Sequence, residues 1–247
     1  GKQPEVLFWV GAAGSYDDRA KKISRAFVKI LNQANVDFAV LGTEESSTGD
    51  AAKRAGNEFL FQMQAMMNIE VLNGYEVKKI VTCDPHSFNT LKNEYPSLGG
   101  KYEVFHHTQF IQNLISEGRI KIDDDTLKGK RVTFHDPCYL GRANEVYESP
   151  RDLIKRLGVN LTEMKRNKAT ALCCGAGGAQ MFKDAEKGDK EINVLRTEDA
   201  LKTKPNIIVT GCPYCNTMMT DGIKFKEKEA EVLVKDIAEL IAEANKL

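Results

Sequence analysis

Five of the six cysteines in this 247-residue chain lie in its second half, at spacings that suit a metal centre. Cys138 is followed after 34 residues by the adjacent pair Cys173 and Cys174, and 37 residues later by the Cys-x-x-Cys turn of Cys212 and Cys215. Such a turn can place two thiolates on one metal centre. Two adjacent cysteines do not easily chelate a single tetrahedral ion, and they suit a larger centre. The pattern therefore favours a centre with several irons.

Three other uses of these thiols stay open at this point. A structural zinc ion is satisfied by four ligands, so it would leave one of the five thiolates unused. A redox dithiol at Cys212 and Cys215 would leave the other three cysteines unexplained. Free cysteines are often simply buried, but inert burial is a poor account of five cysteines in one half of the chain.

Residues beside the cysteines could support a cofactor. The glycines of the segment 175–178 let the backbone come close to a cluster and aim N–H groups at its sulfides, so Gly175 and Gly177 are candidate cofactor-binding residues. His135 is placed either to donate to a cluster sulfur or to fill the end of a strand. His86, in a turn of the first half, is expected to cap or pack rather than to bind a ligand.

Strand and helix patterns alternate along the chain. Short apolar runs predict strands, and apolar positions at helical spacing predict helices. Repeated strand–helix units with short connections favour an α/β fold with parallel sheets. The predicted strands are 5–10, 37–41, 77–82, 102–105, 131–134 and 206–210; the predicted helices are 17–35, 50–72, 108–116, one opened by Ser149 as N-cap and Pro150 and closed by Gly158, and 232–244.

The two halves of the chain are copies of each other. The segment 80–87 matches 208–215 at an offset of 128, 45–49 falls opposite 172–176 at 127, and 9–12 falls opposite 135–138 at 126. We therefore predict a tandem duplication of two Rossmann-like halves, residues 1–120 and 130–247. All three landmarks follow predicted strands, and ligands of open parallel sheets lie beyond the carboxyl ends of the strands. The three cysteine loops should thus converge on one point.

The pattern Cys138…Cys173-Cys174-Gly175…Cys212-Pro213-Tyr214-Cys215 resembles the cysteine-rich CCG domain, found in the B subunit of heterodisulfide reductase and in iron–sulfur subunits of lactate and glycolate oxidation. That family is itself a tandem duplication, so the resemblance covers nearly the whole chain. It implies one [4Fe-4S] cluster, of the non-cubane type that five cysteines hold in heterodisulfide reductase. Carried over by position, the ligands are Cys138, Cys173, Cys174, Cys212 and Cys215.

The first half departs from this pattern. Where the family motif has cysteines, this chain has Ala12, Ser46, Ser47, Asp84 and Ser87. Alanine cannot ligate, and serine and aspartate are poor substitutes for thiolate on an iron–sulfur centre. The one local thiol, Cys83, is a place off the Cys212-equivalent position and is expected to be a partly buried free cysteine. We therefore expect no complete cluster in the first half.

Composition excludes several classes of protein. The 35 Lys and Arg balance 35 Asp and Glu, which argues against nucleic-acid binding. No apolar run reaches the roughly 20 residues needed to cross a bilayer, and Gly1-Lys2-Gln3-Pro4 shows no signal-peptide pattern. A cytoplasmic, reducing location is therefore expected, with membrane association only through partners, and there clustered cysteines more often serve metal or redox chemistry than structural disulfides.

These observations and the resemblance together predict an iron–sulfur electron-transfer subunit of a redox complex. The implied partner is a flavoprotein dehydrogenase or another iron–sulfur subunit, with a disulfide or a quinone as a possible acceptor. Reduction of a disulfide at the single cluster is the enzymatic alternative. A zinc-stabilised cysteine-rich interaction module is the alternative without redox activity.

Overall fold

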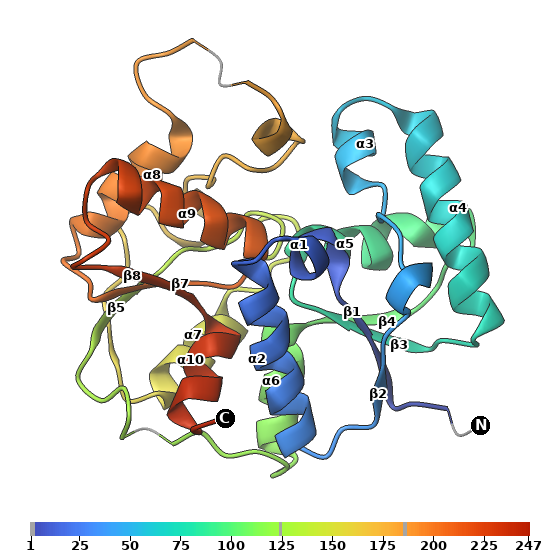
Figure 1. Ribbon diagram of the computed structural model, residues 1–247, viewed down its shortest axis with the longest axis horizontal. Helices are drawn as coiled ribbons and strands as arrows, with labels where there is room; N and C mark the ends of the chain where they lie inside the picture. Colours follow the sequence, from blue (N-terminus) through green and yellow to red (C-terminus); the bar gives the residue numbers. More distant parts are fainter. Residues whose placement is uncertain (1–2, 124, 185–186) are drawn as a thin grey trace.

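The computed structural model describes residues 3–123, 125–184 and 187–247, so Gly1, Lys2 and Asp124 of the predicted N-terminal and connecting segments lie outside it. Each half of the chain forms one four-stranded sheet in which every pair of neighbouring strands is parallel (Figure 1). The predicted α/β fold of two Rossmann-like halves is confirmed. The first sheet has the order β2 (Phe38–Ala39), β1 (Val6–Trp9), β3 (Lys79–Thr82), β4 (Glu103–His106); the second has β6 (Asn160–Leu161), β5 (Arg131–Phe134), β7 (Ile207–Thr210), β8 (Leu233–Asp236).

Helices connect the strands in both halves. In the first half they are α1 (Gly11–Tyr16), α2 (Ala20–Gln33), α3 (Asp50–Arg54), α4 (Glu58–Gly74), α5 (Pro85–Asn89) and α6 (His107–Ser116). In the second half they are α7 (Glu148–Arg156), α8 (Ile192–Leu201), α9 (Pro213–Phe225) and α10 (Ile237–Ala244). Shorter 3₁₀ or π turns lie at Gly42–Glu44, Thr90–Glu94, Tyr95–Leu98, Lys168–Thr170 and Gln180–Phe182. Among the described residues, no helix combines the length and apolar character needed to cross a bilayer.

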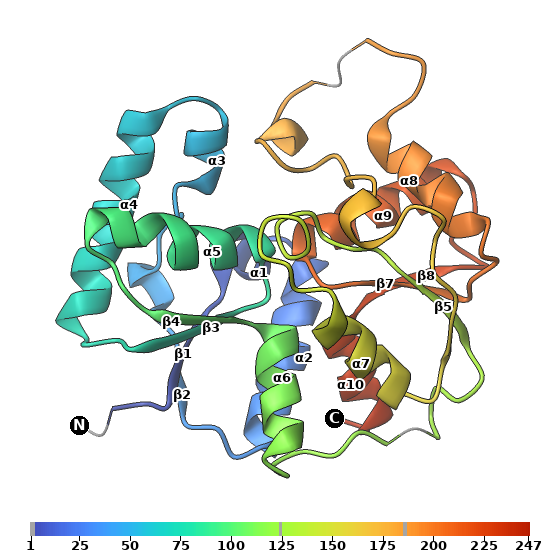
Figure 2. The same ribbon diagram turned by 180° about the vertical axis from the view of Figure 1, so that it is seen from behind.

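One hydrophobic core joins the two halves. Successive side chains of a strand point to opposite faces, so Phe8 of β1 enters this shared core while Trp9 packs on the other face of the first sheet. The shared core also contains Phe134 and Val209 of the second sheet. Helices α2, α6, α7 and α10 supply most of its remaining side chains and lie between the two sheets (Figures 1 and 2). Both sheets are thus covered on two faces, as parallel sheets require.

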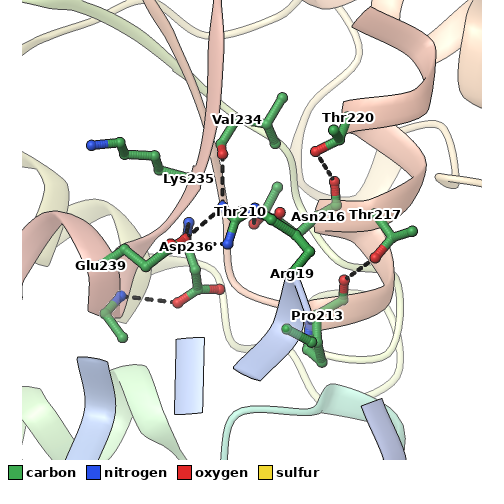
Figure 3. Close-up of polar contacts among 12 residues, drawn as sticks. Arg19, Thr210, Pro213, Asn216, Thr217, Thr220, Val234, Lys235, Asp236 and Glu239 are labelled. Atoms are coloured by element: carbon green, nitrogen blue, oxygen red, sulfur yellow. Dashed lines mark hydrogen bonds and ion pairs between the residues drawn. The ribbon is translucent and has the colours of Figure 1, made fainter. Parts of the chain in front are cut away.

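Polar contacts also fix the last helix of the second half against the first half. Arg19, which precedes α2, forms an ion pair with Glu239 at 2.7 Å and donates to the carbonyl oxygen of Val234 at 2.8 Å (Figure 3). His107 Nε2 lies 3.0 Å from Asp236 Oδ1, and both side chains are fully buried. Asp236 caps α10 by accepting from the N–H of Ala238. The same residue therefore begins the helix and holds it to the first half.

Two predicted helices differ from the structure. Residues 232–244 do not form one helix, because Leu233–Asp236 pairs with β7 as strand β8 and only Ile237–Ala244 is helical. Residues 50–72 form two helices, because Gly56 takes a φ of +88° that ends the first, and the Asn57 side chain caps the second by accepting from Leu60 N–H. In both cases apolar spacing continues through a capping residue that starts a new element.

The predicted start of the helix after β5 was also wrong. Helix α7 begins at Glu148, with Tyr147 before it and no side-chain cap, so Ser149 is not its N-cap and Pro150 lies within the first turn. Gly158 does follow its end, with a φ of +67°. A proline in the first turn is tolerated because the N–H groups there have no intrahelical partner.

Candidate metal centre

The second sheet brings three loops together at its carboxyl edge. The connections after β5 and β7, which are adjacent in the sheet, leave on opposite sides, and such a point of reversal is where open parallel sheets bind ligands. Cys138 follows β5, and Cys212 and Cys215 follow β7. The segment after β6 adds Cys173 and Cys174. The structure therefore places all five predicted ligands on converging loops.

The sulfur atoms of the five cysteines form one connected group. Cys215 Sγ lies 3.3 Å from Cys174 Sγ. Cys174, Cys212 and Cys215 form one packed cluster with Cys173 against it, and Cys138 lies close enough to Cys173 for the two thiols to shift each other's pKa. All six cysteines of the chain are free thiols, and Cys174, Cys212 and Cys215 are buried. A compact group of buried sulfurs is the arrangement that a polynuclear centre needs.

Backbone N–H groups point at two of these sulfurs. Gly175 donates to Cys173 Sγ at 3.3 Å, and Cys215 donates to Cys212 Sγ at 3.5 Å at the N-terminus of α9. Gly175 has a φ of +95°, which a residue with a side chain rarely adopts. Its predicted part beside the cofactor is thus consistent with its geometry. Donors of this kind favour the thiolate form of a cysteine.

The thiols cannot all ionise by themselves. Hydrogen bonding to a neighbouring sulfur, together with burial, raises the pKa of Cys138, Cys174 and Cys215 above the usual range of a cysteine. Hydrogen bonds from Cys138 and Cys174 lower the pKa of Cys173. One thiolate among several protonated thiols is what such a group supports without a cation, because like charges at contact distance repel.

His135 lies close enough to two of the sulfurs to share a metal with them, but its tautomer does not suit a ligand. One of its ring nitrogens, Cys174 Sγ and Cys215 Sγ all lie within 4.8 Å of one another. Its Nδ1 accepts from Arg196 Nε at 3.0 Å, and an arginine can only donate. The ring proton must therefore be on Nε2, which is buried without a partner among the described residues. Burial lowers the pKa of His135 to about 3, so the ring is neutral.

Arg196 was not found from the sequence. Its side chain is fully buried, donates to the carbonyl oxygen of Arg166 at 2.7 Å and holds the His135 ring as described. It lies on α8, 22 residues after Cys174, with no motif around it. Arg196 reaches the site because α8 packs against the loop after β5. The spacing of residues along the sequence therefore could not predict its role.

The matching loops of the first half surround a small polar pocket of about 60 Å³. Its lining includes the five residues that stand in place of cysteines: Ala12, Ser46, Ser47, Asp84 and Ser87. Asp84 caps α5, accepting from the N–H groups of His86 and Ser87 and from the Ser87 hydroxyl. Cys83 is fully buried in the shared core rather than partly buried as predicted, and burial raises the pKa of its thiol. This pocket therefore offers no thiolate to a metal.

Comparison with known proteins identifies the family. The family model of the CCG cysteine-rich domain matches residues 6–92 and 132–220. The chain is 50% identical over 245 residues to the probable iron-sulfur-binding oxidoreductase FadF of Bacillus subtilis (strain 168), covering 99% of this chain and 34% of that protein. It is 44% identical over 250 residues to the EtfAB:quinone oxidoreductase of Syntrophomonas wolfei, covering 99% of this chain and 35% of the relative.

A third relative is one of the subunits of the dihydromethanophenazine:CoB–CoM heterodisulfide reductase of Methanosarcina barkeri. It is 33% identical over 251 residues, which cover 97% of this chain and 59% of the relative. The chain spans about a third of the length of the first two relatives. With both halves matched by the same model, the chain belongs to the CCG cysteine-rich domain family and carries two copies of the domain.

Proposed function

We propose that this chain is an iron–sulfur electron-transfer subunit that holds one [4Fe-4S] cluster, of the non-cubane type, in its second repeat. The observation that supports this most directly is the single group of five cysteine sulfurs on three loops. The proposed ligands are Cys138, Cys173, Cys174, Cys212 and Cys215, with Gly175 and Gly177 beside the cofactor. We take the repeats as residues 1–120 and 130–247, and the first as free of a cluster.

The donor set fits a cluster better than a zinc ion. A structural zinc site takes four ligands, and the one group of described residues that suggests a mononuclear site combines His135 with Cys174 and Cys215. In that group Arg196 occupies Nδ1 of His135 and leaves the proton on Nε2, so this nitrogen has no free lone pair. His135 is therefore suited to donate a hydrogen bond to sulfur. The five thiolates remain as ligands for several irons.

When bound, a cluster of this type supplies one-electron chemistry. The protein's own residues keep it away from water and direct N–H groups at its sulfurs. Three of the five cysteines are buried, and Gly175 and Cys215 donate backbone N–H groups at the site. Hydrogen bonds to sulfur and exclusion of solvent are the main means by which a protein sets a cluster's potential.

Electrons must enter and leave, so a single cluster implies partners. We propose a flavoprotein or another iron–sulfur subunit as the direct electron donor or acceptor. The final electron acceptor is proposed to be a quinone or a disulfide. The names of the relatives support this: one is an oxidoreductase of EtfAB and quinone, and one belongs to a heterodisulfide reductase. A cytoplasmic location is proposed for these domains, while one relative is a probable membrane-anchored ferredoxin.

Metal analysis of the chain purified without oxygen tests the proposal. Iron, acid-labile sulfide and zinc per chain are measured together with the visible spectrum. About four irons and four sulfides per chain, with a broad absorption, are expected. About eight irons would contradict the assignment of an empty first repeat. One zinc without sulfide, in a colourless protein, would replace the electron-transfer proposal by the zinc-stabilised module.

A further inference from the structure

One side chain of the first repeat lies close to all three cysteine loops of the second. The His86 ring lies 4.3 Å, between centroids, from the ring of Tyr139, the residue after Cys138. It lies 5.8 Å from the ring of Tyr214, between Cys212 and Cys215, and meets it edge to face at 89°. A Cβ atom added to Gly177 would lie 3.4 Å from His86 Cε1. The backbone of the loop that begins at Cys173 thus passes close to the His86 ring, and both line the same pocket.

The position of His86 has a reason in the duplication. His86 and Tyr214 are equivalent residues, since the segments 80–87 and 208–215 match at an offset of 128. Each follows the proline that begins the helix after the third strand of its sheet. The two carboxyl edges face each other, and residues of both repeats line the pocket at the first repeat's emptied loops. An imidazole therefore stands where the other repeat places a phenol.

Several charges keep this imidazole cationic. Asp50 Oδ2 lies 2.9 Å from its Nδ1. Burial alone would lower the pKa of His86, but the hydrogen bond to Asp50 and the charges of Asp84 and Asp50 raise it to about 9. Asp50 also accepts from Arg54 Nε at 3.2 Å, and the Arg54 guanidinium lies 5.3 Å over the Tyr139 ring. Tyr139 is thus in contact with two cations from the first repeat.

We propose that the first repeat, which has no thiolates of its own at these loops, acts as a charged cap on the second, and that the His86 imidazolium raises the reduction potential of the cluster held there. This inference rests on the proposed function. A positive charge beside a cluster stabilises the reduced form, which carries one more negative charge, over the oxidised form. The His86 side chain is only 11% exposed and lies against aromatic rings and a glycine, so solvent screens its charge less than it would on an open surface.

The test compares the midpoint potential of the cluster in four proteins that hold the same amount of iron per chain. His86→Gln removes the charge and keeps a polar side chain, His86→Lys keeps a charge with a different shape, and Lys29→Gln removes the same charge from a position on α2 away from the cysteine loops. The potential of His86→Gln is expected to shift to lower values than the wild type. His86→Lys and Lys29→Gln are expected to stay close to it, and the electron paramagnetic resonance spectrum of the reduced cluster is expected to be retained.

The possible results separate the inference from the function beneath it. An unshifted potential in His86→Gln, with the cluster present, would overturn the charged cap and leave the electron-transfer proposal standing. Equal shifts in His86→Gln and His86→Lys, or equal loss of iron from both, would mean that the shape of His86 matters rather than its charge, which also overturns the inference. A wild-type chain without iron and sulfide would overturn both proposals.

Discussion

His86 and Tyr214 occupy equivalent places in the two repeats, and their rings meet edge to face with centroids 5.8 Å apart. The pair links the start of α5 to the start of α9 across the boundary between the repeats. In the first repeat Asp84 caps the N-terminus of α5 with its carboxylate. The equivalent loop of the second repeat carries Cys212 and leads to Cys215. The polar pocket of the first repeat and the cysteine sulfurs of the second repeat thus lie on facing edges of the two sheets.

Replacing Cys174 tests the five-cysteine site. Its sulfur lies 3.3 Å from that of Cys215, so Cys174→Ser should lower the iron content or leave a simpler cluster, because serine is a poor ligand for these irons. Iron, sulfide and the visible spectrum per folded chain provide the measurement. Cys83→Ser is the matched control, a buried cysteine of the shared core, and should keep its iron. Full retention of the cluster in Cys174→Ser would contradict the ligand set.

Removing Arg151 should destabilise the fold below the Cys138 loop. Its guanidinium donates to both carboxylate oxygens of Asp136, at 2.7 and 2.9 Å, and both side chains are 3% exposed. Arg151→Met leaves the Asp136 carboxylate buried without its counter-charge, which typically costs about 3–5 kcal/mol. The free energy of unfolding in urea is the measurement. Lys155→Met, on the same helix but exposed, should change it by less than about 0.5 kcal/mol; equal effects would refute the argument.

Gly222 should be needed for the close packing of α9 on α8. A Cβ atom added there would lie 2.0 Å from Thr197 Oγ1 and 3.1 Å from the Asn193 carbonyl oxygen. Gly222→Ala should therefore lower the free energy of unfolding by about 1–3 kcal/mol, although alanine favours a helix by about 1 kcal/mol. Gly74→Ala, at the end of α4 with nothing within 4 Å, is the control. Thermal unfolding should rank it at or above the wild type, and a Gly222→Ala protein as stable as that control would disprove the packing role.

The carboxyl of Glu45 should make stability depend on pH. Burial raises its pKa from 4.5 to about 7, although the N–H groups of Val10 and Gly11 favour the ionised form. Between these two pKa values the folded chain keeps a proton on Glu45 that the unfolded chain releases. The contribution of Glu45 to the free energy of unfolding is therefore fully present below pH 4.5 and is lost as the pH rises through 7. The loss is on the order of 3 kcal/mol, at about 1.36 kcal/mol per pKa unit.

Unfolding in urea at pH 5 and pH 8 measures this dependence. Glu45→Gln cannot ionise and should lose less stability than the wild type over that range. Glu58→Gln, which alters an exposed carboxylate at the start of α4, should follow the wild-type profile. Parallel profiles for the wild type and Glu45→Gln would show that Glu45 is not the source.

The meeting of the five cysteines could be predicted because it depends on topology alone. Cys138 and Cys212 follow neighbouring parallel strands, and the carboxyl ends of such strands lie at one edge of the sheet. The third loop, with Cys173 and Cys174, was placed by its match to residues 45–49 in the duplication. Strand β8 was missed because apolar residues from Val232 onward suit a helix, although the capping box of Asp236 and Glu239 marks where the helix really begins.

Contacts between the repeats could not be predicted in this way. Arg196 reaches His135 through the packing of α8, and His86 reaches Tyr139 only because the two carboxyl edges face each other. Hydrophobic periodicity specifies which face of each element is buried, but it does not specify which element covers it. The role expected for His86, in packing, describes its ring contacts but omits its ion pair with Asp50.

The shared core has a consequence for the order in which the protein matures. Helix α2 of the first repeat packs against α10, more than 200 residues later in the chain. When residues 1–120 have emerged from the ribosome, the apolar face of the first repeat that packs on α10 is therefore still uncovered. Transiently exposed apolar surface of this kind is prone to aggregation. Until residues 237–244 have emerged, the face of α2 that packs on α10 lacks its native cover.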